Sequence, residues 1–197
     1  MSIEDRIREQ FEQSLSVKRA ALAAMAGPIA RASAIMAASL EAGGKVLACG
    51  NGGSAADAQH FAGELIGRFE IERRALAAVA LTTDSSVLTC VANDYSYDDV
   101  FARQVSGLGR RGDVLLAIST SGNSPNVLKA VQVAQQAGMT VVALTGKGGG
   151  KMTPQLRTED VSLCVPADRT TRIQEVHLLT LHCLCDAIDH LLIGESA

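Results

Sequence analysis

The sequence predicts an α/β protein in which a doubly wound, five-stranded parallel sheet is sandwiched by helices, with N-terminal helices before the first strand. Five short apolar runs alternate with mostly helix-like segments. The runs are almost continuously apolar and are bounded by Gly, Ser and Thr, which is typical of parallel strands buried on both faces. The 197 residues, 47% of them hydrophobic, suffice for one core. We therefore expect one domain over 1–197, with N-terminal helices over 1–42 that contribute to an oligomer and an α/β sandwich with its terminal helix over 43–197.

The N-terminal segment is predicted to form two helices. Apolar residues recur at every fourth position near the start, at Ile3, Ile7, Phe11 and Leu15, and form one stripe on a helix. Gly27 and Pro28 are expected to end this helix, because proline disrupts a helix interior. A second helix then runs from Ile29 to about Ala42, where a Gly-Gly pair ends it.

The five predicted strands and a long final helix make up the rest of the chain. The strands lie in KVLACG, LAAVALT, DVLLAIST, MTVVALTG and VSLCVP, which begin at positions 45, 76, 113, 139 and 161. The terminal helix is predicted from about Thr171 to Leu192.

Composition excludes several classes of function. The net charge of −3 gives no basic field for nucleic acid, and aromatic residues at 3%, with no Trp, leave few platforms for stacking bases. The five cysteines have no zinc-binding spacing and are predicted to be buried free thiols. The charged opening MSIEDRIREQ does not resemble a secretory signal, and no apolar run approaches the roughly 20 residues of a membrane span. We expect a cytoplasmic protein without a membrane or nucleic-acid partner.

A glycine-rich turn after the first strand leaves several ligands open. Gly50, Gly52 and Ala55 satisfy the loose dinucleotide pattern GxGxxG/A, and Asp84 lies near the end of the second strand, where a ribose contact is expected. Asp84 is, however, farther from the glycines than the usual spacing of about 20 residues. Ser54, predicted as the N-cap of the following helix, favours a smaller anionic ligand, and the turn also suits a purely structural role.

A second polar turn, STSGNSPN, follows the third strand. It gathers four hydroxyls, with Ser124 as the predicted N-cap and Pro125 as the first helical residue. Because ligands of such sheets bind beyond the carboxyl ends of the strands, this turn is a candidate anion site.

Ionisable residues gather on two helices. His60 and Glu64 are four apart and share one helix face, which by itself is typical of a solvated surface pair. The terminal helix carries RIQEVHLLTLH, which contains Gln174 and His182. Eight residues of helix rise about 12 Å, too far for both side chains to meet one ion. If both serve one site, either Gln174 precedes the regular helix or the two come from different subunits.

The stretches GKVLACGNGGSAADAQHFAGEL, TTDSSVLTCVANDYSY, AISTSGNSPNVLKA, ALTGKGGGKM and RIQEVHLLTLHCLCDAID resemble the phosphoheptose isomerases, the sedoheptulose 7-phosphate isomerases of the SIS-domain, flavodoxin-like fold. The resemblance runs from about residue 3 to 192. It implies a cytoplasmic homotetramer, with active sites near subunit interfaces, that converts sedoheptulose 7-phosphate to D-glycero-D-manno-heptose 7-phosphate through an enediol, toward the ADP-heptose of lipopolysaccharide core.

The resemblance also assigns site residues. It implies one zinc ion per subunit, held by His60, Glu64, Gln174 and His182, with Glu64 and His182 also acting on protons. Implied substrate contacts, besides Glu64 itself, are Asn51, Gly52, Gly53, Ser54, Asn93, Asp94, Ser119, Thr120, Ser121, Ser124 and Gln174. Arg68 is a further candidate, and Thr171 stands where some members have an acidic residue, so one polar contact of the site is not expected here.

A non-catalytic alternative exists within the same fold. A related tetrameric regulator binds the bacterial replication initiator protein, and it lacks equivalents of Glu64 and His182. Both residues are present here, so the sequence favours the enzyme.

Overall fold

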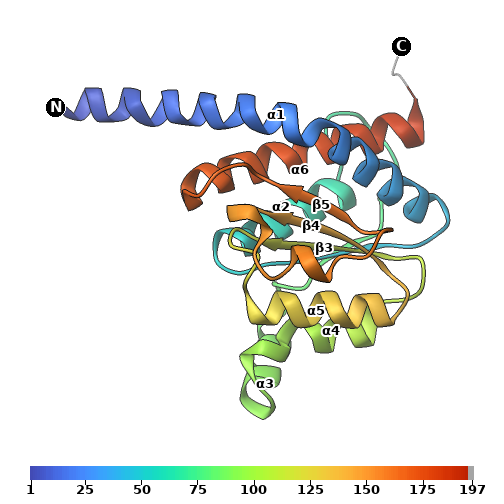
Figure 1. Cartoon of the computed structure of the whole chain (residues 1–197). Coiled ribbons are helices and arrows are strands. Elements are labelled where there is room, and N and C mark those ends of the chain that lie inside the picture. The colour runs from blue at the N-terminus through green and yellow to red at the C-terminus, as the bar shows by residue number, and fades with distance from the viewer. Residues whose placement is uncertain (195–197) are drawn as a thin grey trace.

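The computed structural model describes residues 1–194 and confirms the doubly wound α/β fold (Figure 1). Its strands are β1 (Val46–Cys49), β2 (Ala78–Ala80), β3 (Val114–Ser119), β4 (Thr140–Thr145) and β5 (Val161–Cys164). All neighbours pair in parallel in the order β2-β1-β3-β4-β5, the flavodoxin-like order. The strand order reverses between β1 and β3, so their carboxyl ends form the crevice where ligands of such sheets bind.

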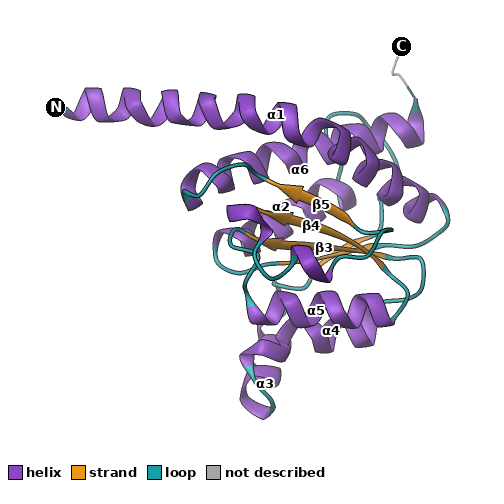
Figure 2. Cartoon of the chain, viewed as in Figure 1, coloured by secondary structure: helices purple, strands orange, loops and turns teal. Residues whose placement is uncertain are grey.

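Both faces of the sheet are buried, which explains the continuous apolar runs. Within β3, Leu116 and Ile118 face one core cluster, whereas Leu115 and Ala117 face the other. The first face is covered by α1 (Ile3–Glu41), α2 (Gly53–Ile66) and α6 (Thr170–Ile193). The second is covered by α3 (Ser85–Asp94), α4 (Val100–Leu108) and α5 (Pro125–Gln136), as Figure 2 shows for α4 and α5.

The N-terminal region forms one helix, so the prediction of two helices was wrong. α1 runs unbroken through Gly27 and Pro28, and it changes direction in its second half (Figure 1). An interior proline costs about 3 kcal/mol and bends a helix. Packing offsets this cost, because Met25, Ala32 and Met36 are buried against the rest of the fold.

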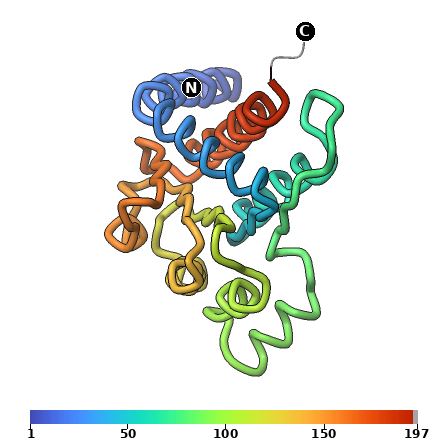
Figure 3. The backbone as a smooth tube through the Cα atoms, turned by 90° about the vertical axis from the view of Figure 1, so that its right-hand side faces the viewer, coloured from blue at the N-terminus to red at the C-terminus, as the bar shows by residue number. Residues whose placement is uncertain are grey.

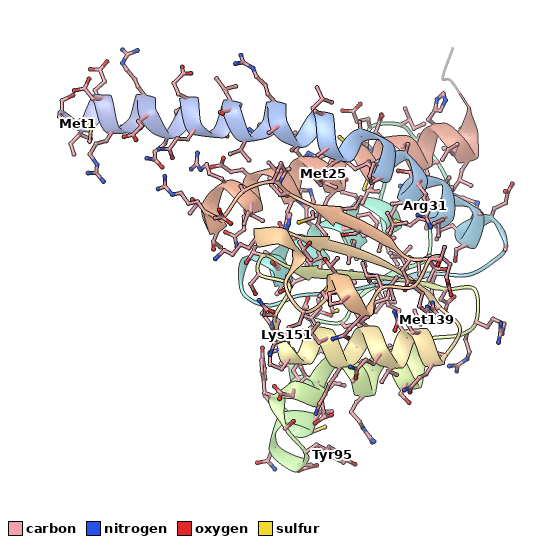
Figure 4. All side chains as sticks on the ribbon, in the orientation of Figure 1. Met1, Met25, Arg31, Tyr95, Met139 and Lys151 are labelled. Carbon is pink, nitrogen blue, oxygen red and sulfur yellow. The ribbon has the colours of Figure 1, made fainter. Side chains whose placement is uncertain are left out.

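The two longest helices lie side by side above the sheet. Figure 3 shows α1 and α6 running next to each other, and the first turns of α1 extend beyond the body of the molecule in Figure 1. The predicted stripe of Ile3, Ile7, Phe11 and Leu15 lies on this extension. Each of these residues exposes between 46% and 73% of its surface to solvent. Met1 marks its free end in Figure 4.

By length and composition alone, both helices are long and apolar enough to cross a membrane. The core helices of soluble proteins share this length and composition, and 44% of the most apolar stretch of α6 is buried inside the fold. The buried faces of α6 pack on the sheet, which accounts for its hydropathy.

All five cysteines are free, as expected, but only Cys49 and Cys185 are buried. Cys164 is half-buried, and Cys90 and Cys183 are exposed. The prediction that the thiols are buried was therefore wrong for these three. Cys90 and Cys183 lie in apolar helical runs, but on faces that this chain does not cover.

Candidate active site

Side chains from α2 and α6 converge at the C-terminal half of α2. His60 and Glu64 lie one helical turn apart, and His60 Nε2 is 2.9 Å from Glu64 Oε1, with the imidazole N–H as donor. His182 reaches across from α6, and its Nε2 lies 3.5 Å from His60 Nε2. The structure thus brings together three of the four predicted metal ligands, including both predicted catalytic residues.

This cluster is partly open to solvent. The side chains of His60 and Glu64 are 38% and 26% exposed, so a ligand can approach them. The His182 ring meets the His60 ring edge to face at 5.1 Å between centroids, and Phe69 packs on its other side at 5.7 Å. These contacts orient the imidazole of His182 toward α2.

Gln174 lies elsewhere on α6. It is the fifth residue of regular helix, so it does not precede the helix, and about 12 Å of rise separates it from His182. Its side chain abuts Gly53, where a Cβ would collide with the amide nitrogen. Within one chain Gln174 therefore belongs to the glycine turn, at the opposite end of α2 from Glu64.

The donor set of the cluster suits zinc only in part. Two imidazole nitrogens and a carboxylate oxygen are ordinary zinc ligands, and separations of 2.9 and 3.5 Å are close to those between ligands about 2 Å from one metal. Across residues 1–194, however, no group of three or more His, Cys, Asp or Glu has the arrangement of a complete metal site. One chain therefore supplies a partial set of ligands.

The glycine turn joins β1 to α2 differently from the prediction. Gly52, at φ +58°, is the N-cap, and Ser54 lies inside the first turn with its side chain buried, so the prediction of Ser54 as N-cap was wrong. The positive φ favours glycine and turns the chain sharply after the strand. No side chain caps α2, and the amides of Ser54 and Ala55 donate to the carbonyls of Asn51 and Gly52, so the amide of Gly53 is the one left for an anion.

Asn51 is held firmly in place beside this turn. Its amide exchanges two hydrogen bonds, of 2.8 and 2.9 Å, with the amide of Asn126 on α5. The Tyr97 hydroxyl donates to Asn51 Oδ1 at 3.1 Å. Sequence reasoning missed both partners, because only the sheet topology brings the start of α5 next to the first turn.

Asp84 has a structural role. Its carboxylate accepts a hydrogen bond from the Val87 amide and caps α3, so the ribose contact considered for it lacks support. Asn93 and Asp94 end the same helix, where Asn93 Nδ2 donates to Asp94 Oδ1. α3 lies at the far end of the molecule from α1 and α6 (Figure 1), and the contacts of Asn93 and Asp94 do not tie them to the cluster.

The hydroxyl turn after β3 forms a braced cradle. Ser124 is the N-cap of α5 and Pro125 its first residue, as predicted, and Ser124 Oγ lies 2.9 Å from Ser119 Oγ. The loop 146–152, GKGGGKM, closes over this turn: the Met152 amide donates to Gly122 O at 3.0 Å and the Lys151 amide to Asn123 Oδ1 at 2.9 Å. Thr120 and Ser121 lie in the same turn, and Lys151 is labelled beside the start of α5 in Figure 4.

Asp57 is a further candidate that sequence reasoning missed. It lies with Gly53, Thr171 and Gln174 around a cavity of about 310 Å³, and burial raises its pKa to about 6 despite the nearby His60. Its Oδ2 has no hydrogen-bond partner among the described residues. Its position one turn before His60 on α2 is the sequence feature that could have identified it.

Arg68, the further candidate from the sequence, lies beyond the end of α2 and pairs with Glu72 at 3.9 Å.

His177, buried on α6, makes stability depend on pH. Its Nε2–H donates to Thr145 O at 3.1 Å, and burial lowers its pKa to about 4. Between pH 6.5 and 4 the unfolded chain binds a proton that the folded chain excludes, so the free energy of unfolding falls as pH falls through this range, by up to about 3 kcal/mol. Denaturant unfolding of His177→Gln at several pH values should show a shallower fall than the wild type.

The control for this experiment is His190→Gln, since His190 is exposed near the end of α6. It should keep the wild-type slope. Equal slopes in all three proteins would show that His177 is not responsible.

Comparisons with known proteins agree with this fold. The model of the SIS domain family matches residues 10–146. A phosphoheptose isomerase of Azoarcus sp. (strain BH72) is 66% identical, over 98% of both chains. Among solved structures, a phosphoheptose isomerase from Neisseria gonorrhoeae is 51% identical at a TM-score of 0.91, over 95% of this chain and 99% of that one. One from Francisella tularensis is 46% identical at 0.94, over 96% of this chain and 100% of that one.

Proposed function

The chain belongs to the phosphoheptose isomerases of the SIS-domain family, and we propose that its cluster of His60, Glu64 and His182 does the isomerisation. The enzyme is an aldose–ketose isomerase of heptose phosphates. Its substrate is sedoheptulose 7-phosphate and its product D-glycero-D-manno-heptose 7-phosphate, on the route to the ADP-heptose of lipopolysaccharide. The observation that carries the proposal is the convergence of Glu64 and His182 on His60, within 2.9 and 3.5 Å.

The chemistry needs one base and one acid. Aldose–ketose exchange moves a proton between neighbouring carbons, C1 and C2, through an enediol. Glu64 takes a proton from C1 and, after exchange with solvent, delivers a proton to C2, while His182 exchanges protons with the oxygens of the enediol. Each such contribution is worth roughly 10²- to 10⁴-fold in rate.

The phosphate end of the substrate is held away from the reacting carbons. Ser119, Ser121 and Ser124 offer neutral hydroxyl donors, and the N-terminus of α5 favours negative charge. Thr120, Asn51 and the amides of Gly52 and Gly53 extend this polar surface toward the sugar hydroxyls. Binding the remote phosphate orients the reacting end, which lowers the entropic part of the barrier.

A second copy of the chain completes each site in this proposal. Gln174 and the glycine turn lie at one end of α2, and Glu64 and His182 at the other, about 16 Å of helix rise apart. The exposed apolar stripe on α1 supports association, as does an apolar groove of about 290 Å³ between α1 and α6 that Leu22, Met25 and Leu179 help to line. We assign a homotetramer with sites near its interfaces, in the cytoplasm, where free thiols persist.

Zinc is the proposed cofactor, one ion per subunit. His60, Glu64 and His182 supply nitrogen and oxygen donors, and Gln174 of a neighbouring copy would supply a fourth ligand. The bound ion would polarise the substrate carbonyl as a Lewis acid. The partial ligand set within one chain fits a metal that is held between subunits.

The test is turnover with controlled metal. Protein supplied with zinc and sedoheptulose 7-phosphate should form the aldoheptose phosphate, detected by chromatography of the sugar phosphates. Treatment with a chelator should remove the activity, and added zinc should restore it. No conversion with zinc present would overturn the proposed function, whereas full activity after verified metal removal would overturn only the cofactor.

A further inference from the structure

Arg73 carries a buried positive charge that the proposed chemistry does not use. It lies in the segment between α2 and β2, and its side chain is 3% exposed. Its partner Asp189, on α6, has a side chain that is 5% exposed. Arginine and aspartate are seldom buried unless they are paired, so their placement calls for a structural reason.

The Arg73 guanidinium joins α2 to α6. Its Nε–H donates to Asp189 Oδ1 at 2.7 Å. Its Nη2 donates to the backbone carbonyl of Glu64 at 2.8 Å, and its Nη1 to that of Leu65 at 2.9 Å. These carbonyls lie in the last turn of α2, where carbonyl oxygens have no N–H donors within the helix and where a cation is favoured.

The contacts lie directly behind the candidate active site. Glu64 presents its backbone to Arg73 and its side chain to His60. Asp189 follows His182 by about two turns on α6, roughly 10 Å along the helix. The guanidinium therefore fixes the helix that carries the base relative to the helix that carries the acid. Besides this clamp, the contact of His182 with His60 and the core cluster that includes Phe61 and Leu184 join the two helices here.

We propose that Arg73 and Asp189 form a clamp, the α2–α6 clamp, that positions Glu64 and His182 for proton transfer. The proposal rests on the proposed isomerase function. Arg73 is a positioning residue, because it acts through the backbone of Glu64 and does not reach the substrate. Lysine cannot replace it, since only the planar fork of arginine donates to a carboxylate and two carbonyls at once.

The test compares Arg73→Lys with Arg74→Lys. Arg74 is the adjacent residue and is exposed, so its variant keeps the charge count without touching the clamp. Arg73→Lys should lower kcat about 100-fold with KM within about twofold, because a small misplacement of reacting groups has an effect of that size. Asp189→Asn, which keeps the side-chain size, should show the same pattern and serves if Arg73→Lys fails to fold.

A second readout does not depend on turnover. The chain has four histidines, so labelled imidazoles give a spectrum simple enough to assign by NMR. In Arg73→Lys the signals of His60 and His182 should shift, with that of the exposed His190 unchanged and with Arg74→Lys matching the wild type throughout. Unshifted signals of His60 and His182 would overturn the clamp. So would a kcat equal to that of Arg74→Lys, whereas an inactive wild type with shifted signals would overturn only the isomerase function.

Discussion

Glu64→Gln is expected to lower kcat by about 10³-fold or more while the protein keeps its fold and its assembly. Glutamine has the size of glutamate, and its amide oxygen still accepts the hydrogen bond from His60 Nε2. It cannot take a proton from a sugar carbon, so the variant loses general base catalysis, which is worth roughly 10²- to 10⁴-fold. A stopped assay of the aldoheptose phosphate measures the effect.

The control for this variant is Glu72→Gln, which removes the same charge from a side chain that is 88% exposed in the segment after α2. It should match the wild type. Size-exclusion chromatography distinguishes a catalytic role of Glu64 from a structural one. If Glu64→Gln dissociates into smaller species, Glu64 is a structural residue. A variant with wild-type kcat would remove Glu64 from the mechanism.

Gly122→Ala is expected to disrupt the phosphate cradle. Gly122 has a φ of +63°, and a Cβ there would collide with the carbonyl oxygen of Gly149 in the loop 146–152. The substitution forces the two loops apart and strains the turn, at a cost of about 1–3 kcal/mol in the free energy of unfolding. Displaced donors weaken hydrogen bonds to a charged phosphate, so KM should rise about 10-fold or more.

Gly107→Ala is the matched control for this substitution. Gly107 lies in α4 and is exposed, and a Cβ there meets nothing within 4 Å. Alanine favours helix over glycine, so the control should equal or slightly exceed the wild type in stability, with KM unchanged. Thermal unfolding and initial-rate kinetics together check both variants. A Gly122→Ala protein with wild-type KM would show that the cradle does not bind the phosphate.

Much of the fold was predictable because it depends on local patterns. The runs around Val46 and Val114 are buried on both faces, and their apolar composition alone marks them as central parallel strands. The single helix α1 was not predictable. Pro28 disrupts a helix in isolation, and only packing of both flanking segments against the fold shows that the helix continues.

The site was predictable in its residue types and only partly in its geometry. The spacing of His60 and Glu64 places them on one face, and their contact follows from it. The approach of His182 to His60 depends on how α2 and α6 pack, which periodicity does not describe. Arg73 gave no sequence signal, because its role lies in capping α2 from a segment without regular structure. The separation of Gln174 from His182 along α6 follows from the rise of a helix per residue alone.

Proton NMR of sedoheptulose 7-phosphate incubated with the wild-type protein in D₂O, with zinc supplied, tests the central claim most directly. An enediol formed by Glu64 and protonated in an exchanging site leads to an aldoheptose phosphate that carries deuterium at C2. The account predicts that this product accumulates with the wild type and not with Glu64→Gln. A sugar phosphate whose signals stay unchanged with the wild-type protein would contradict it.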